Sequence, residues 1–462
     1  MIAPSLPFVP PAPKIPPKDL PLWKAIPASF RSTLEIWPDY AFDVDFNRRR
    51  SLGVELFLIN DPQDIRHVLT NNAANYRRPM ATLRIVRPLG GDGVFLAEGE
   101  AWRRQRRLLA PTFTPAAVSR LIPHLQAAGA HLLRGIEGED SVNLSEAFQD
   151  VALETVFRAL FSMPENESRE KLSALGRSYV NGPGRPGLLD FLARSENAFP
   201  FAARGRKRFQ DVWFAAIDAV IAERRAPGPA REAKGPAGEA KDLLDMLIAL
   251  RDADTGESLT DAELRSQCAT MGFAGSETTA RMMFWAVYLL SQDHAEQERL
   301  RAEIAAFPPE RAQNLDDLQN WPRLRNVLLE ALRLYPPIAH ITREAVGPDE
   351  IHGVKIPPGA QLWISPWVMR RHRKYWDNPT AFLPDRFAGK PAPWIQTPAY
   401  IPFGAGPRIC IGLGFALAEA QIVLAQLLAR YRIGLSGEKP VLPVARVTIE
   451  PSYEPLFRLE RL

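Results

Sequence analysis

The sequence has little of what marks secreted or membrane-spanning proteins. Among its 462 residues are two cysteines, Cys268 and Cys410, too few for a disulfide framework, so we expect a reducing compartment, the cytoplasm. No apolar run reaches the roughly 18 residues of a membrane-spanning helix, so we expect no transmembrane anchor. Residues 1–17 lack the basic-then-apolar order of a secretory signal.

A large excess of one charge is also missing. The 57 Lys and Arg face 53 Asp and Glu, for a net charge of +4. Because no basic stripe interleaved with aromatic residues occurs either, we exclude nucleic-acid binding. Apolar residues make up 46% of the chain and charged residues 24%, as in a globular protein. Proline is abundant, with 43 residues, and the Pro-rich residues 1–30 are predicted to form an extended segment.

Apolar residues at helical spacing dominate the rest of the chain. They predict helices at 101–110, 144–162, 203–225, 261–291, 321–335 and 411–431. The helix at 261–291 begins with a predicted capping box of Thr260 and Glu263. Short β-branched or aromatic runs predict strands at 54–59, 351–356 and 361–364, and the charged, Pro- and Gly-rich residues 226–241 predict a surface connector.

The most informative stretch surrounds the second cysteine. Residues 402–412 read Pro-Phe-Gly-Ala-Gly-Pro-Arg-Ile-Cys-Ile-Gly. A lone cysteine is usually a small buried hydrophobe, which is our interpretation of Cys268. The stretch, however, matches the pattern F-x-x-G-x-R-x-C-x-G at every specified position, and it thereby resembles the haem-ligand loop of the cytochrome P-450 family.

The resemblance implies a single domain at 31–462, mainly α with a small β lobe, although length alone would suggest about three domains. It also implies haem b with Cys410 as the axial thiolate, which would push electron density onto the iron. Phe403 would shield the sulfur, and Gly404 and Gly412 would let the backbone turn and approach closely. Arg408 would bind a haem propionate.

Further propionate contacts are implied for Trp102 and Arg106, one helical turn apart, and for Arg343. The alternative for this basic stretch is a helix face in solvent, which is our interpretation of Arg104 and Arg107. Such a face would also attract an acidic electron donor. The resemblance implies separate ferredoxin and ferredoxin-reductase partners that carry electrons from NAD(P)H to a monomeric enzyme, with O2 as co-substrate.

A second match lies in the predicted long helix, where residues 274–279 read Ala-Gly-Ser-Glu-Thr-Thr. In the family, such an acid–alcohol pair handles oxygen and protons, which implies catalytic roles for Glu277 and Thr278. The alternative makes Glu277 a solvated helix residue and Thr278 a hydroxyl bonded to the carbonyl four residues back. A third match, E-x-x-R at Glu330 and Arg333, implies a buried structural network that Arg386 completes. Asp385 departs from the Glu that is more common beside it.

Together these matches predict a monooxygenase that inserts one oxygen atom of O2 into a hydrophobic substrate. The alternatives are a haem-thiolate peroxygenase or isomerase, which usually lacks the acid–alcohol pair, and a haem sensor, which needs an output module. His340 could hydrogen-bond a polar substrate group, although a locally satisfied histidine is at least as common. The resemblance places the substrate pocket at Leu83, Ile85, Val86, Phe273, Ala274, Ile338, Ala339 and His340.

Overall fold

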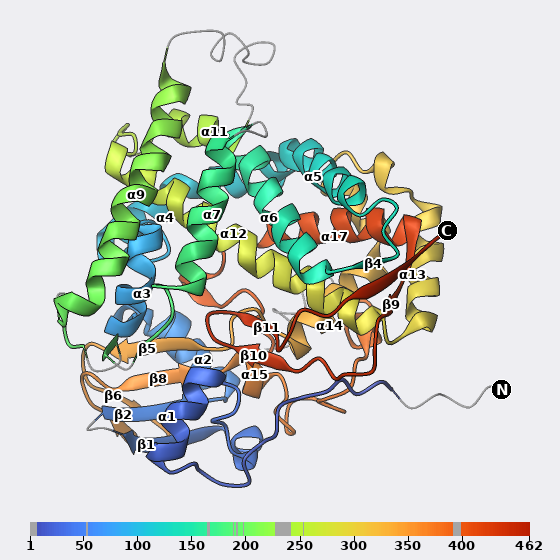
Figure 1. The fold of residues 1–462 in the computed structure, drawn as a ribbon. Helices are drawn as coiled ribbons and strands as arrows, with labels where there is room; N and C mark the ends of the chain where they lie inside the picture. The colour runs from blue at the N-terminus through green and yellow to red at the C-terminus, as the bar shows by residue number, and fades with distance from the viewer. Residues whose placement is uncertain are drawn as a thin grey trace.

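The computed structural model describes residues 7–51, 54–163, 167–187, 189–190, 193–196, 198–226, 242–252, 254–390 and 399–462. A larger helical part lies beside a smaller part built on a sheet (Figure 1). The predicted class, mainly α with a small β lobe, is therefore confirmed. Apart from Ala226, the predicted connector at 226–241 lies outside the described residues.

All the predicted helices form, each within three residues of its predicted ends. The α-helices are α1 (Leu22–Arg31), α2 (Pro62–Arg66), α3 (Met80–Gly90), α4 (Gly99–Leu109), α5 (Pro115–Gly135), α6 (Leu144–Phe161), α7 (Glu167–Asn181), α9 (Pro200–Arg225), α11 (Leu243–Ala249), α12 (Asp261–Leu290), α13 (His294–Ala306), α14 (Pro322–Leu334), α15 (Pro366–Met369) and α17 (Leu413–Arg430). Short helices of other types are η1 (Asp39–Phe42), η2 (His67–Asn71), η3 (Ala73–Asn75), η4 (Ala110–Phe113), η6 (Pro309–Arg311), η7 (Asp317–Asn320), η8 (Pro384–Phe387) and η9 (Gly406–Arg408).

The strands form one five-stranded sheet, in the order β1-β2-β8-β5-β3, and three smaller sheets. They are β1 (Phe46–Ser51), β2 (Val54–Ile59), β3 (Tyr76–Arg77), β4 (Ser141–Val142), β5 (Ile341–Ala345), β6 (Asp349–Ile351), β7 (Val354–Ile356), β8 (Gln361–Ile364), β9 (Tyr431–Leu435), β10 (Pro443–Ala445), β11 (Ile449–Pro451) and β12 (Phe457–Arg461). The single strand predicted at 351–356 is wrong. Positive φ angles at His352 and Gly353 reverse the chain there, so that β6 and β7 form a hairpin of their own.

Of the Pro-rich segment predicted at 1–30, the described residues 7–21 contain no helix or strand, whereas α1 forms at Leu22–Arg31 and shortens the extended part. The extended part is attached to the body of the molecule. The Phe382 N–H donates to the Phe8 carbonyl at 2.8 Å, and the Asp39 N–H donates to the Pro16 carbonyl at 2.9 Å.

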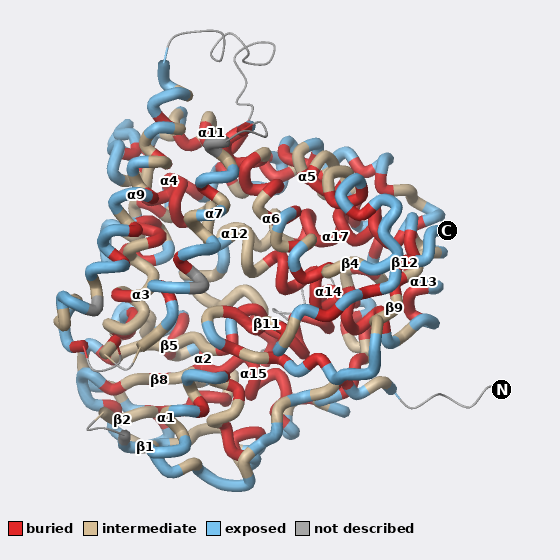
Figure 2. The backbone as a smooth tube through the Cα atoms, in the orientation of Figure 1, coloured by how far each residue is buried: buried red, intermediate tan, exposed pale blue. Residues whose placement is uncertain are grey.

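The long helix α12 crosses the middle of the molecule (Figure 1). Its predicted capping box is present, with Thr260 and Glu263 each accepting a backbone N–H from the other. Every residue from Thr279 to its end at Leu290 is buried, against α6, α14 and α17. Figure 2 shows buried backbone in α14 and α17 and a half-buried stretch in the middle of α12.

The helix α17 is long and apolar enough to cross a membrane by length and composition alone. It is nevertheless a core helix, since it packs against α5, α12, α13 and α14, and Leu417 to Leu428 are all buried. Its apolar composition therefore reflects its place in the core of the fold.

Candidate active site

Two segments far apart in the sequence keep accessible surface deep inside the fold. In α12, residues 271–278 are half-buried or exposed although buried residues flank them on both sides. In the loop before α17, residues 402–416 show the same pattern. Helix α17 follows this loop and packs against α12. Both accessible segments therefore adjoin the same buried helical core.

Cys410 lies on this loop with an accessible side chain, although protein surrounds the thiol. Burial raises the pKa of Cys410, and the Gly412 N–H and the Arg106 guanidinium only partly oppose that rise. The thiol is therefore protonated at neutral pH until a cation binds it, because a metal deprotonates a coordinating thiol. The Cys410 N–H donates to the Phe403 carbonyl at 2.9 Å, which closes the loop.

Two glycines show why the loop needs this sequence. Gly406 has a φ of +69°, and a Cβ there would lie 2.1 Å from the Leu69 carbonyl oxygen, so only glycine fits. Gly404 shares the positive φ. At Gly412, in contrast, a Cβ would meet no protein atom within 4 Å. The side of the loop next to Cys410 is therefore open to a ligand.

Three arginines converge near the loop around a single carboxylate. Arg78 lies 3.0 Å from Glu98, and Arg408 pairs with the same carboxylate. Arg343 has one described partner, the Thr342 carbonyl at 2.9 Å. Burial, together with Arg78 and Arg408, lowers the pKa of Arg343 to about 9, and the pKa of Arg408 falls to about 10 for the same reasons. The cluster carries two uncompensated positive charges, which suits a ligand with two negative charges.

Helix α4 adds two of the predicted residues to this cluster. The Arg408 guanidinium lies 4.5 Å from the centre of the Trp102 ring. Burial lowers the pKa of Arg106, and a thiolate at Cys410 would oppose that fall. Arg106 makes no hydrogen bond or ion pair within the part of the chain that the structure describes. The structure thus brings Trp102, Arg106, Arg343 and Arg408 together with Cys410.

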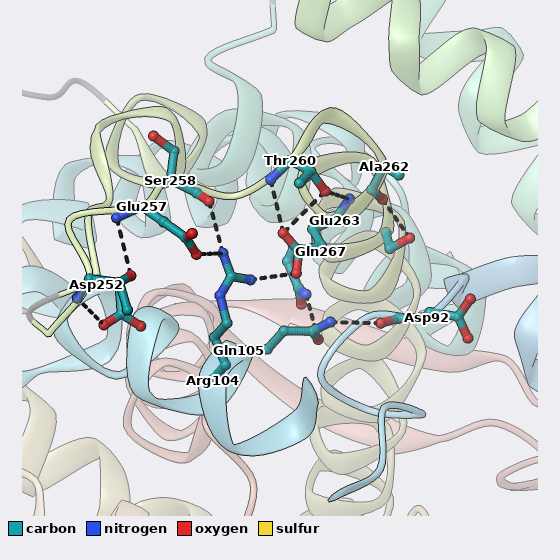
Figure 3. Close-up of polar contacts among 12 residues, drawn as sticks. Asp92, Arg104, Gln105, Asp252, Glu257, Ser258, Thr260, Ala262, Glu263 and Gln267 are labelled. Atoms are coloured by element: carbon teal, nitrogen blue, oxygen red, sulfur yellow. Dashed lines mark hydrogen bonds and ion pairs between the residues drawn. The ribbon is translucent and has the colours of Figure 1, made fainter. Parts of the chain in front are cut away.

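The other arginines of α4 correct the sequence interpretation. Arg104, assigned to solvent, binds Glu263 at 2.5 Å and the Ser258 carbonyl at 3.0 Å (Figure 3). Arg107, assigned likewise, binds Asp252 at 2.8 Å. Both tie α4 to the loop before α12, but only Arg104 is drawn out of solvent, since the Arg107 side chain remains 51% exposed, as its assignment to solvent predicted. Figure 3 shows this network with its neighbours Gln105 and Gln267, whose side chains join at 2.8 Å.

The acid–alcohol pair lies at the half-buried middle of α12. The Thr278 hydroxyl donates to the Ala274 carbonyl at 2.7 Å, the bond to the carbonyl four residues back that was its alternative. Glu277 is not a solvated residue, because its side chain is 18% exposed. It accepts hydrogen bonds from Arg281 at 2.8 Å and from Thr448 at 3.1 Å.

Glu277 also lines a cavity that offers about 110 Å³ to water-sized molecules. The cavity lies between α6, α7, α9 and α12, and its walls are mainly apolar, with Phe157 and Trp213 among them. Its polar side chains, besides Glu277, are Gln149, Arg177, Ser276, Arg281 and Glu450. The cavity has room for several water molecules, since each needs about 10–15 Å³ of such volume.

The predicted structural network is assembled as the pattern implied. Arg333 binds Glu330 at 2.8 Å through two N–H groups, and both side chains are fully buried. Arg386 donates to the same carboxylate at 3.1 Å. Asp385 is exposed and lies 3.5 Å from Arg323. The departure at Asp385 therefore leaves the network unchanged.

Of the predicted substrate-pocket residues, Phe273 lines the cavity, and its neighbour Ala274 on α12 is exposed. Leu83, Ile85 and Val86 are half-buried on α3, which packs against α12, while Ile338 is exposed and Ala339 is buried. The substrate pocket stays a prediction.

His340 is held locally through one ring nitrogen, whereas its buried Nδ1 has no hydrogen-bond partner among the described residues. Its Nε2 lies 2.8 Å from the Thr33 hydroxyl, and its ring packs between Trp37 and Trp363. Burial lowers the pKa of His340 to about 3. The side chain is therefore neutral and held in place.

Comparison with known proteins now identifies the fold. A family model for cytochrome P-450 matches residues 48–455. The chain belongs to the cytochrome P-450 family. Among its relatives, pentalenene oxygenase of Streptomyces avermitilis is 31% identical over 395 residues, 84% of each chain. Cyclooctatin synthase of Streptomyces melanosporofaciens is 29% identical and covers 82% of this chain and 80% of its own. Cytokinin hydroxylase of Arabidopsis thaliana is 29% identical over 379 residues, 79% of this chain and 71% of its own.

Solved structures of cytochromes P-450 have the same fold. CYP102L1 superimposes with a TM-score of 0.79 at 22% identity, over 98% of this chain and all of its own. A cyanobacterial cytochrome P-450 with bound retinoic acid gives 0.77 at 21% identity, over 90% of this chain and 92% of its own. The chain is thus a monooxygenase-type oxidoreductase of this family.

Sequence reasoning missed several residues of the site. Arg78 and Glu98 belong to the arginine cluster, and Thr448 and Glu450 lie beside Glu277 or Arg281. Arg78 and Glu98 stand in no motif, and the other two lie in a hairpin more than 160 residues from Glu277. No spacing in the sequence could have indicated these contacts.

Proposed function

We propose that the protein is a haem-thiolate monooxygenase that inserts one oxygen atom of O2 into a hydrophobic organic substrate. The observation that carries this proposal is the Cys410 thiol on its glycine-containing loop, beside arginines with two uncompensated charges. Haem b carries two propionates and an iron that takes a thiolate. The described residues thus fit the group in both charge and ligand chemistry.

The chain's own residues would hold the haem at two places. Cys410 would ligate the iron, and the open side of Gly412 would leave room for the ring. The propionates would be bound by Arg106, Arg343 and Arg408, together with Trp102. Their negative charges would compensate the unpaired positive charges of the arginines. When bound, thiolate-ligated haem supplies the activation of O2.

Glu277 and Thr278 would move protons to the reaction. The water-sized cavity beside Glu277 gives its carboxylate access to solvent protons. The Thr278 hydroxyl lies one residue further and now donates to Ala274. Rotation about the Thr278 Cα–Cβ bond would release this hydroxyl from the Ala274 carbonyl, so that it could donate its proton to the reaction. Glu277 would then supply a new proton to the hydroxyl.

The substrate would lie against the half-buried middle of α12. Met271, Phe273 and Ala274 present apolar surface there, which favours a hydrophobic molecule. The relative pentalenene oxygenase, by its name, also acts on a small organic substrate.

Electrons would come from NAD(P)H through separate proteins of the ferredoxin and ferredoxin-reductase type. The enzyme would act as a cytoplasmic monomer. On α4, Arg103 and Arg107 remain about half exposed despite their internal ion pairs. They would therefore still attract an acidic donor.

The test is the carbon monoxide difference spectrum of the dithionite-reduced protein. We expect the strongly red-shifted Soret band of a thiolate-ligated haem, and C410S should lose both this band and turnover. As the matched control, C268S removes a buried thiol of α12 and should keep the spectrum. A normal spectrum or turnover in C410S would refute the assignment.

A further inference from the structure

Glu277 has a carboxylate neighbour from a distant part of the chain. Glu450, on β11, lines the same cavity as Glu277, and Arg281 lies between the two. Arg281 is 4% exposed and binds Glu277 at 2.8 Å, and its other end lies 3.8 Å from Glu450. It also donates to the Ser145 hydroxyl at 2.9 Å. The guanidinium thus holds both carboxylates at one end of the cavity.

The hairpin that carries Glu450 is fixed to the core. Strands β10 and β11 pair antiparallel, and the Trp285 indole donates to the Ile449 carbonyl at 2.9 Å. The Ile449 N–H donates to the Pro337 carbonyl at 2.9 Å. From the same hairpin, the Thr448 hydroxyl donates to Glu277 at 3.1 Å. A rigid hairpin therefore sets the position of Glu277 and presents Glu450 beside it.

We propose that Glu450 is a second proton carrier, in series with Glu277, and that Thr448 is the residue that orients Glu277 to receive the proton. This inference rests on the proposed function. A proton from bulk solvent, carried by cavity water, would protonate the Glu450 carboxylate, whose O–H would pass it, directly or through cavity water, to the Glu277 carboxylate. Glu450 is then a carboxylate again, and Glu277 becomes one when it gives its proton to the reaction, so charge and protons balance. Arg281 keeps its proton, because a guanidinium does not deprotonate in proteins.

The charges around Glu450 agree with this role. Burial raises the pKa of Glu450, and the negative charge of Glu277 adds to the rise. Arg281 and Arg446 oppose it, the latter through a hydrogen bond of 2.5 Å. Arg177 of α7 is the remaining charged group of the cavity wall. A carboxyl with a raised pKa holds a proton closer to neutral pH than an ordinary glutamate does.

The experiment compares E450Q with E460Q, an exposed glutamate paired with Arg432 that serves as matched control. The measurements are product formed per NAD(P)H oxidised, the pH profile of turnover and the effect of D2O on its rate. The carbon monoxide difference spectrum reports whether the thiolate–haem centre is intact. We expect E450Q to keep the spectrum, to lose about tenfold in coupling, and to show an altered pH profile and a larger D2O effect. E460Q should match the wild type.

Thr448 is tested by the pair T448V and T448S. T448V removes the hydroxyl and should lower coupling, and T448S keeps the hydroxyl and should restore it. If Thr448 only supported the hairpin, T448V and T448S would have the same coupling. If E450Q does not bind haem, E450D retains the carboxylate but withdraws it by one methylene, and it should uncouple with an intact spectrum.

The outcomes separate this inference from the proposed function. If E277Q uncouples turnover but E450Q and E450D both behave as wild type, the second carrier is refuted and the monooxygenase proposal stands. If E277Q is also unchanged, the proton path of the proposed function fails as well. Loss of the thiolate spectrum in the wild type would instead refute the proposed function itself.

Discussion

Two buried arginine clusters in this molecule differ in how completely their N–H groups are satisfied. In the structural network, Arg333 uses all five donors, on Glu330 and on the carbonyls of Arg370, Pro379 and Ala381. Near Cys410, Arg343 uses one donor, on the Thr342 carbonyl. Arg333 is fully buried, whereas Arg343 and Arg408 keep some accessible surface, through which a ligand could reach them. A cluster that folding alone leaves unsatisfied indicates a ligand, because an unpaired buried charge is costly.

The largest effect is expected when the satisfied cluster is broken. E330Q removes the carboxylate and leaves Arg333 buried without its counter-charge, which should cost about 3–5 kcal/mol in the free energy of unfolding. The measurement is urea-induced unfolding followed by circular dichroism. E35Q, which breaks the partly exposed pair with Arg31, is the control and should cost less than about 1 kcal/mol. Equal losses in the two variants would abolish the distinction between a structural network and a surface pair.

A smaller effect is expected in the cluster near Cys410, where a substitution should weaken haem binding without lowering the stability of the haem-free protein. R343L should leave the haem-free protein as stable as the wild type or slightly more stable, because it removes a poorly paired cation. It should weaken haem binding by about 1.5–3 kcal/mol, the range for hydrogen bonds to charged groups. Haem titration and urea unfolding of the haem-free protein measure the two quantities. If R343L lowers the free energy of unfolding of the haem-free protein as much as E330Q does, Arg343 stabilises the fold and is not reserved for a ligand.

The smallest effect near neutral pH concerns His340, a buried imidazole that stays neutral. In the folded protein the pKa of His340 is about 3, below its value of 6.5 in an unfolded chain. The unfolded state therefore binds more protons than the folded state as the pH falls. The stabilising contribution is therefore complete above about pH 6.5 and is lost progressively toward pH 3. It should already have fallen by about 1 kcal/mol at pH 6. Unfolding of H340N between pH 7 and pH 4 should show a flatter pH dependence, and an unchanged slope would contradict the assignment.

The helices of the site were located well because each is long, and the capping box of Thr260 and Glu263 marks the start of α12. The residue pattern failed at 351–356, where a tight reversal at His352 and Gly353 divides an apparently continuous strand. It also failed for Arg104, since a basic helix face in solvent and one paired with an acidic loop have the same sequence. For His340, only the positions of Thr33, Trp37 and Trp363 decided between substrate contact and local packing.

The sequence by itself determined the chemistry that is carried by contiguous residues. The loop at 402–412, the acid–alcohol pair and the E-x-x-R pair each lie within one turn or one loop, so local geometry is enough to relate their members. Only the tertiary structure decided which charges meet across the fold. Arg78 joins Arg343 and Arg408, and the hairpin at 443–451 reaches Glu277. The physical reason is that charge pairing and burial depend on distances between segments that are far apart in the sequence. The order of the residues does not give those distances.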